Sequence, residues 1–244
     1  MPLKQSTITA LAVCLGTAAF AQTVTDTEKK STWDSSAALG LTLTEGNSRT
    51  VQINGNLQST KKWDQNEINL GADGTYGKDR SVKSAEALRG YGQYNRLFDD
   101  RFFGYLRLEA LHDAIADVDY RITFSPGVGY YFIKNDGTNL RGEVGPGLVH
   151  EKQGGEVNTY ATLRLAERFE HKINDRSRIW QSLEFLPQID DIENFIINAE
   201  IGIETQITKS FSQRTFIQNT YDNEPAPGRR ENDVKLVAAI AYKF

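Results

Sequence analysis

Apolar and polar residues alternate along most of this 244-residue chain. In "VQINGNLQ", residues 51–58, Val51, Ile53 and Leu57 lie on one face, and glutamine and asparagine occupy the other. The segments "SAALGLTLT" (36–44) and "INLGADGTY" (68–76) repeat the pattern. Successive side chains of a β-strand point to opposite faces, so this alternation predicts strands with one apolar face. No stripe at helical spacing competes with it, and the pattern predicts an all-β fold.

Nine further segments continue the alternation and bring the expected number of strands to about twelve. Arg89, Arg107 and Glu109 leave the outward face of the first two of these segments open. A length of roughly 11–14 residues suits a tilted strand that crosses a bilayer. The further strands are expected near 85–96, 101–113, 119–132, 138–151, 156–170, 176–189, 194–207, 210–222 and 232–244.

Two kinds of connection separate these strands. The segments "LFDD", "KNDGT", "KIND" and "TKS" are typical of tight hairpin turns, because Asp, Asn and Gly favour that geometry. Longer polar connections are expected at "GKDRSVKSAE", "AIADVD", "KQGGE", "DDIEN" and "NEPAPGRREN". With an even number of strands both termini of the chain lie on one side of the membrane, and that side then carries most of the tight turns. Outer-membrane barrels have this asymmetry.

The composition of the two faces indicates which of them is turned inward. A soluble barrel buries its apolar face, but here that face contains few large residues and would fill a core poorly. A lipid-facing wall needs no such packing, and a strand array can span a bilayer only when it is closed. The sequence therefore predicts a closed antiparallel transmembrane β-barrel of about twelve strands over 33–244. The charged residues expected to face its lumen are Asp73, Arg121, Arg141, Glu143, Arg164, Arg168, Glu184, Glu200 and Glu204.

Aromatic residues gather near both ends of the predicted strands, as expected for rings that prefer the two membrane interfaces. One girdle is expected at Trp33, Trp63, Phe98, Phe102, Phe132, Phe169, Phe211, Tyr242 and Phe244. The opposite girdle is expected at Tyr76, Tyr120, Phe195 and Tyr221.

The first 21 residues have one cation, Lys4, followed by a short apolar run that ends in "AFA". This is typical of a secretory signal peptide cut before Gln22, and residues 22–32 are expected to form a short periplasmic tether. The single cysteine, Cys14, lies in the signal segment. Without Lys4, 27 of the 28 basic residues remain against 32 acidic ones. A net charge of −5 without a basic stripe argues against nucleic acid as a partner.

Several segments resemble the salt-induced outer membrane protein family of Gram-negative bacteria. They are "TEGNSRT", "LEALHDAIADVDYRITFSPGVGYYF", "TYDNEPAPG" and the closing "AYKF". The resemblance covers essentially 33–244. It implies a location in the outer membrane, among lipid and lipopolysaccharide, and a link to salt stress. The family is otherwise of unknown function, so the resemblance supplies no cofactor and no active-site residues.

The last strand, "VKLVAAIAYKF", places an apolar column toward lipid and Lys235 and Lys243 toward the lumen or the rim. Tyr242 and the terminal Phe244 resemble the C-terminal signal that the barrel-assembly machinery reads. That machinery is therefore an expected partner.

The charged lumen residues have two interpretations. They could form a filter that sets the charge and size of a permeating solute. They could instead form a ladder of salt bridges that fills the lumen, since barrels of ~8 strands are filled and those of ~16–18 strands hold a channel. We expect a non-enzymatic role in the envelope or in osmotic stress, with a narrow diffusion channel as one form of it. A soluble exported barrel with a small apolar ligand, and an outer-membrane hydrolase, are the alternatives.

A hydrolase would have to use the histidines. His112 and Asp113 suggest a base with its orienting carboxylate, and Ser125 or Thr123 would be the nucleophile. Neighbouring residues of a strand point to opposite faces, so this pair is not expected to form. His150 and His171 lie near strand ends.

Two loops have candidate ion contacts. Asp190, Asp191 and Glu193 could hold a hard divalent cation, although a solvated acidic turn is the simpler interpretation. Arg229 and Arg230 could contact lipopolysaccharide phosphate or form part of a solvated loop. The sequence leaves the oligomeric state open.

Overall fold

The computed structural model describes residues 33–45, 51–79 and 82–244. These residues form one compact unit. The predicted signal peptide, 1–21, and the predicted tether, 22–32, lie outside the described residues.

Twelve β-strands make up the described part of the chain, and they confirm the all-β fold and the strand number expected from the alternation. The strands are β1 (Asp34–Glu45), β2 (Val51–Trp63), β3 (Asn66–Asp79), β4 (Val82–Leu97), β5 (Phe102–Asp113), β6 (Val118–Lys134), β7 (Thr138–Gln153), β8 (Glu156–Lys172), β9 (Ser177–Pro187), β10 (Phe195–Gln206), β11 (Phe211–Asp222) and β12 (Asn232–Lys243).

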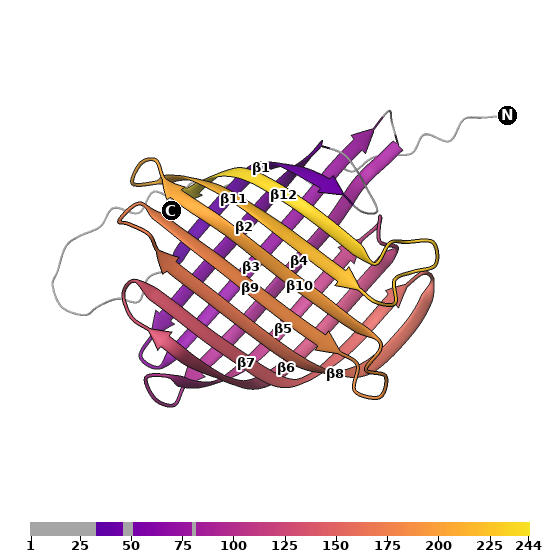
Figure 1. The fold of residues 1–244 in the computed structure, drawn as a ribbon, viewed down its shortest axis with the longest axis horizontal. Helices are drawn as coiled ribbons and strands as arrows, with labels where there is room; N and C mark the ends of the chain where they lie inside the picture. The colour runs from indigo at the N-terminus through magenta and orange to yellow at the C-terminus, as the bar shows by residue number, and fades with distance from the viewer. Residues whose placement is uncertain (1–32, 46–50, 80–81) are drawn as a thin grey trace, which may run out of the picture. The chain divides into compact units, whose positions relative to one another are not determined.

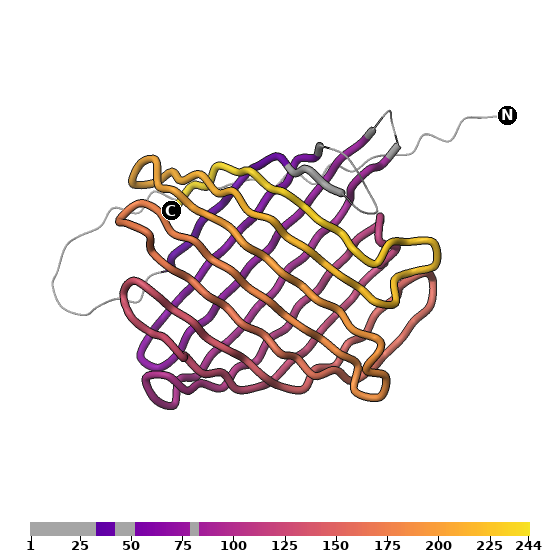
Figure 2. Tube along the Cα trace, viewed as in Figure 1, coloured from indigo at the N-terminus to yellow at the C-terminus, as the bar shows by residue number. Residues whose placement is uncertain are grey.

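The strands form one closed barrel in which each pairs with its sequence neighbours and β12 returns to β1 (Figure 1). Ten antiparallel residue pairs close the barrel, from Ser36 opposite Lys243 to Glu45 opposite Val234. In Figure 2 the strands of the near and far walls cross, because strands of a closed barrel tilt relative to its axis. Each strand has a partner on both sides, the condition for a strand array in hydrocarbon.

Among the described residues, no helix has the length and apolar character needed to cross a membrane.

The barrel has two different ends. Asp34 and Lys243 form an ion pair of 2.7 Å at the end that we call the turn end, and we call the opposite end the loop end. Four connections at the turn end contain a residue whose side-chain oxygen accepts the backbone N–H groups two and three residues later. These residues are Asp99, Asn135, Asn174 and Thr208.

The same hydrogen bonds have an electrostatic consequence at Asp99. Donation from the N–H groups of Phe102 and Arg101 stabilises the ionised carboxylate and holds the pKa of Asp99 below its ordinary value. The tight turns predicted at this end are therefore present.

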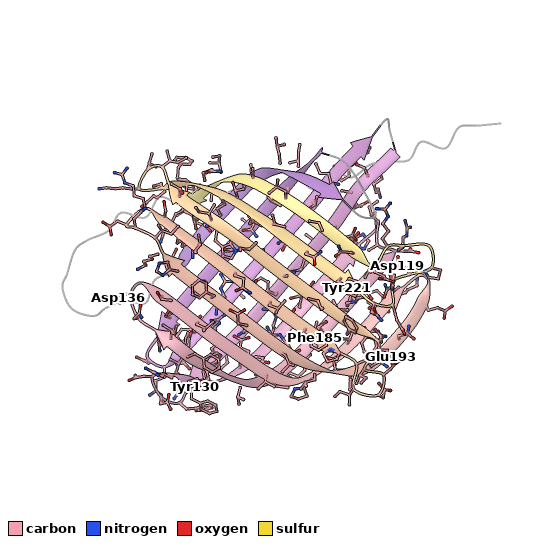
Figure 3. All side chains as sticks on the ribbon, in the orientation of Figure 1. Asp119, Tyr130, Asp136, Phe185, Glu193 and Tyr221 are labelled. Atoms are coloured by element: carbon pink, nitrogen blue, oxygen red, sulfur yellow. The ribbon has the colours of Figure 1, made fainter. Side chains whose placement is uncertain are left out.

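For two of the connections at the loop end, the prediction of a longer connection was wrong. Residues Gly154 and Gly155 alone join β7 to β8, with φ of +60° and +86°, because the two strands pair as far as Gln153 and Glu156. Likewise β3 extends to Asp79 and β4 begins at Val82, so most of "GKDRSVKSAE" belongs to strands. The connections 188–194 and 223–231 are longer, as expected. Figure 3 labels Asp136 at the turn end and Asp119 and Glu193 at the loop end.

The wall has the polarity expected for a barrel in lipid. Large apolar side chains face outward, and Leu39, Ile53 and Leu88 are 71%, 66% and 62% exposed. Polar side chains face inward, and Asn95 and Thr162 are each 1% exposed. A soluble barrel around an apolar ligand requires the opposite arrangement, with an apolar interior, and the described residues do not form such an interior.

Aromatic rings meet near both ends of the barrel. At the turn end Phe98 lies 5.6 Å from Phe102, and Phe211 lies 5.1 Å from Tyr242, between ring centroids. At the loop end Phe195 lies 5.5 Å from Phe185 and 5.7 Å from Tyr221. Figure 3 labels Phe185 and Tyr221. These clusters agree with the predicted girdles.

Two glycines of β6 make room for aromatic rings of β5 on the inner wall. Inward positions of β6 include Gly127 and Gly129, and a Cβ added at either would overlap the ring of Tyr105 or Phe103 from β5. The two rings therefore pack closely against the glycine backbone, where Phe103 is fully buried and Tyr105 nearly so. The Tyr105 ring can thereby reach past β6 and β7, and the Arg164 guanidinium of β8 lies 5.3 Å from its centroid.

The pairing of β6 with β7 is interrupted within the strands. Residues 125–127 have no partner in 145–147 across this seam, although both segments pair on their other sides. Pro126 and Pro146 lie at the centres of the two segments, and proline has no N–H to donate. The "SPG" (125–127) and "GPG" (145–147) segments therefore mark the place where β6 and β7 separate, which the alternation of apolar and polar residues does not predict.

Candidate functional site: the lumen

A cavity of about 1180 Å³ runs through the barrel and is lined by residues of all twelve strands. Its lining includes Asp34 and Lys243 at the turn end and Asp113 and Arg229 at the loop end. The lumen is therefore a single polar space that reaches both ends of the described barrel.

The structure places all nine charged residues predicted to face the lumen on the lining of this cavity. It also settles the face of the two ambiguous strands, since Arg89, Arg107 and Glu109 line the cavity as well. Their outward neighbours Leu88 and Leu108 are more than half exposed.

Glu143 is the centre of the middle part of the lumen. Its carboxylate accepts hydrogen bonds from Arg164 (2.8 Å) and Gln93 (3.1 Å) and lies 3.3 Å from Arg141 Nε. Arg164 also pairs with Glu184 at 2.5 Å. The side chains of Arg164 and Glu143 are only 6% and 5% exposed, so each charge depends on its partners rather than on water.

A second group of ion pairs continues this network over β3, β4 and β5. Arg107 lies 2.5 Å from Glu109 and donates to Gln93 at 3.3 Å. Arg89 lies 3.8 Å from Glu109 and 3.7 Å from Asp73. Gln93 therefore connects the two groups, because it contacts both Arg107 and Glu143.

The loop-end part of the network is centred on Arg121. Its guanidinium contacts Glu151, lies 3.0 Å from Asp222 and donates to Gln153 at 2.9 Å. Tyr160 donates to the second oxygen of Glu151 at 3.0 Å. Arg121 belongs to β6 and Asp222 to β11, so this pair joins strands that are not neighbours.

At the turn-end part, Glu204 accepts from Arg178 at 2.6 Å and lies 3.1 Å from Arg214. Arg178 also lies 3.5 Å from Glu170, which pairs with Arg168 at 2.7 Å. A chain of alternating charges therefore follows β8, β9, β10 and β11.

These contacts unite the two interpretations of the lumen. Most ion pairs join adjacent strands and lie along the wall, where they stabilise it and leave the cavity open. Two of them connect strands that are not neighbours: Arg121 with Asp222, and Arg141 with Glu67 of β3 at 4.0 Å. The ladder of salt bridges is thus present without filling the lumen.

Glu200 differs from the other predicted lumen charges. Its carboxylate accepts from Trp180 Nε1 at 2.5 Å and from Gln218 Nε2 at 2.8 Å. Among the described residues it has no ion pair within 4.0 Å.

The sequence reasoning missed several charged residues of the lumen. Strict two-residue steps could have found them, since Glu67 lies six residues before Asp73 and Arg178 lies six before Glu184. The missed residues with ion pairs in the network are Glu67, Glu151, Glu170, Arg178, Arg214 and Asp222.

The histidines do not assemble a catalytic group among the described residues. His112 Nδ1 lies 2.8 Å from the carbonyl oxygen of Asp119, whereas the Asp113 carboxylate accepts the N–H groups of the next turn. The pairing of His112 with Asp113 is absent, as strand geometry predicts. His150 and His171 contact threonine hydroxyls, at 2.7 Å and 2.9 Å.

The loop ion candidates have different surroundings. Asp190 and Asp191 accept hydrogen bonds from Gln188 and from the Glu193 backbone, and no metal-ligand cluster occurs among the described residues. Arg229 and Arg230 line the cavity at the loop end.

The C-terminal residues lie at the turn end on the outer surface. Tyr242 and Phe244 stack at 6.2 Å, and the Phe244 N–H donates to the Ser35 carbonyl at 3.0 Å. Lys235 and Lys243 line the cavity.

Comparison with known proteins identifies a family and a fold. The family described as "Protein of unknown function, DUF481" matches residues 37–244. No curated protein matches the sequence. The solved NanC porin is 9% identical, covers 85% of this chain and 100% of its own, and has a TM-score of 0.60. The KdgM porin in complex with disordered oligogalacturonate is 10% identical, covers 86% and 99%, and has a TM-score of 0.51. At these identities the likeness concerns the fold alone.

Because Glu143 is the centre of this network, we expect its charge to contribute to the stability of the barrel. Glu143→Gln removes the charge that Arg141 and Arg164 share, and breaking such a buried pair should lower the free energy of unfolding by about 3 kcal/mol. Urea unfolding in lipid vesicles, followed by tryptophan fluorescence, measures this loss. Glu156→Gln, at an exposed position with no ion pair in the part of the chain that the structure describes, is the control, and equal stability of the two variants would contradict the role given to Glu143.

Proposed function

The chain belongs to the DUF481 family, and we propose that it is an outer-membrane β-barrel whose lumen is a narrow aqueous diffusion channel. The observation that carries this proposal is the continuity of the polar cavity from the turn end to the loop end. A wall of paired charges that leaves such a passage suits polar solutes, because it offers hydrogen-bond donors and acceptors along the whole route.

The size of the cavity supports small solutes. A volume of about 1180 Å³ that extends from the turn end to the loop end leaves a narrow passage. Ions and small polar metabolites fit this width, and folded macromolecules do not. The contacts of Arg121 with Asp222 and of Arg141 with Glu67 narrow the passage further.

The outer surface supports the membrane assignment. Exposed leucine and isoleucine side chains suit hydrocarbon, and the aromatic clusters suit the two interfaces. The turn end then faces the periplasm and the loop end faces outward, among lipopolysaccharide. Lipid and lipopolysaccharide are the surroundings that this orientation implies, and Arg229 at the outer mouth could meet their phosphate groups.

A purely structural ladder and a hydrolase receive less support. A lumen stabilised only for rigidity has no need of a cavity that reaches both ends. Catalysis needs a base within hydrogen-bond reach of a nucleophile, and in the described part of the chain neither Ser125 nor Thr123 hydrogen-bonds to His112, whose Nδ1 lies 2.8 Å from the Asp119 carbonyl oxygen. We therefore propose a non-enzymatic role.

Reconstitution into planar lipid bilayers tests the channel directly. The purified protein should produce stepwise currents, and Arg141→Ala should raise the unitary conductance because it removes a side chain that reaches across the lumen. Glu156→Ala, outside the cavity lining, should leave the conductance unchanged. A folded, membrane-inserted barrel that gives no current steps would refute the channel.

We also propose that the C-terminal strand is recognised by the barrel-assembly machinery through Tyr242 and Phe244. Deletion of Phe244 should reduce the amount of protein in the outer membrane, measured by membrane fractionation and heat-dependent gel mobility. Phe211→Ala removes a ring that contacts Tyr242 but keeps the terminus, so it serves as the control. Normal membrane levels after the deletion would contradict this recognition.

The link to salt or osmotic stress rests on the sequence resemblance alone, and the geometry adds nothing to it. If it holds, expression should rise when NaCl is added, and constant transcript levels would remove this part of the role.

A further inference from the structure

Charge compensation differs between the wall of the lumen and its turn end. Each of the eight arginines that line the wall has a carboxylate oxygen within 4.0 Å, so the wall presents little net charge to a solute. These arginines are Arg89, Arg107, Arg121, Arg141, Arg164, Arg168, Arg178 and Arg214.

At the turn end, four exposed cations line the same cavity and have no carboxylate oxygen within 4.0 Å among the described residues. They are Lys134, Lys172, Arg176 and Lys209, which we call the basic rim. Lys134 lies over the Tyr131 ring at 4.8 Å and donates to the Asp100 carbonyl at 2.5 Å, and neither of these two partners carries a negative charge.

The four cations come from neighbouring parts of the turn end. They belong to the ends of the β6–β7, β8–β9 and β10–β11 hairpins, which alternate with loop-end connections around the barrel. The Lys172 N–H donates to the Gly137 carbonyl, and the Gln206 N–H donates to the Arg176 carbonyl, each at 2.8 Å. The charges are therefore gathered on one side of the mouth.

Few carboxylates oppose the basic rim. Asp34 lines this mouth but is paired with Lys243 at 2.7 Å, and Asp175 lines it without an ion pair to any described residue. Asp99, Asp100 and Asp136 lie on the turns outside the cavity lining. Four cations against one unpaired carboxylate leave a net positive mouth.

We propose that the basic rim makes the channel select small hydrophilic anions, with the rim acting at the turn-end mouth. This inference rests on the proposed channel function and adds the class of solute. A mouth of one sign raises the local concentration of oppositely charged solutes and repels cations. Because the paired wall is nearly neutral, the uncompensated rim dominates the choice. The rim is solvated, so its influence extends over a Debye length of ~10 Å at 0.1 M salt and only ~3 Å at 1 M.

The reversal potential under a KCl gradient tests the proposal in bilayers of phosphatidylcholine, which has no net charge of its own. The unmodified protein should be more permeable to chloride than to potassium, and this preference should weaken as both salt concentrations rise. A variant that neutralises the rim should lose most of the preference. It combines Lys134→Gln, Lys172→Gln, Arg176→Gln and Lys209→Gln.

A matched variant removes four cations that do not line the cavity and should keep the chloride preference. It combines Lys61→Gln, Lys78→Gln, Arg96→Gln and Arg101→Gln. Steady currents without chloride preference in the unmodified protein, or an unchanged preference in the rim variant, would overturn the inference while the channel stands. Absence of currents from a barrel with normal heat-dependent gel mobility would overturn the channel itself.

Discussion

Closure of the backbone hydrogen-bond ladder is the constraint on which the rest of this structure depends. In hydrocarbon an unpaired backbone N–H or C=O group costs several kcal/mol, so a sheet with free edges cannot span a bilayer. The ten residue pairs between β1 and β12 remove those edges. Once the ladder is closed, each strand has one face outside and one face inside, and the two-residue period sorts every side chain between lipid and lumen.

This sorting forces the charges of the wall into a confined space. A charge held away from water must be paired, or it costs more than its contacts return. Arg164 and Glu143 illustrate the result, since both are almost fully buried and each has more than one charged or polar partner. Adjacent strands supply most partners, so the network follows the wall. The glycines of β6 leave room for rings from β5, and a cavity persists beside them.

Much of this arrangement could be predicted from the sequence. The alternation predicts the strand number, the closed barrel and the inward face of residues such as Arg121 and Glu200, because these depend only on period two. The partner of Arg121 could not be predicted. Asp222 is 101 residues away, and only the register of several hairpins brings it within 3.0 Å. The short β7–β8 turn was missed because polar residues near the end of a strand are equally compatible with a loop and with the inward face of a longer strand.

Local chemistry also determined features that a pattern of apolar and polar residues does not encode. Gly127 and Gly129 count as neutral positions in such a pattern, yet they determine where the rings of β5 lie. Pro126 and Pro146 interrupt the pairing of β6 with β7 although both lie inside strands. In each case the decisive property is what the residue lacks, a side chain in one and a backbone N–H in the other.

In the proposed channel, water fills the inside of the barrel and lipid surrounds its outside, and cysteine accessibility tests this arrangement most directly. Asn56 lines the cavity and its neighbour Leu57 is 56% exposed on the outer wall. In a Cys14→Ser background and in lipid vesicles, a water-soluble, membrane-impermeant thiol reagent should label Asn56→Cys and leave Leu57→Cys unlabelled. Labelling of Leu57→Cys with protection of Asn56→Cys would contradict the account.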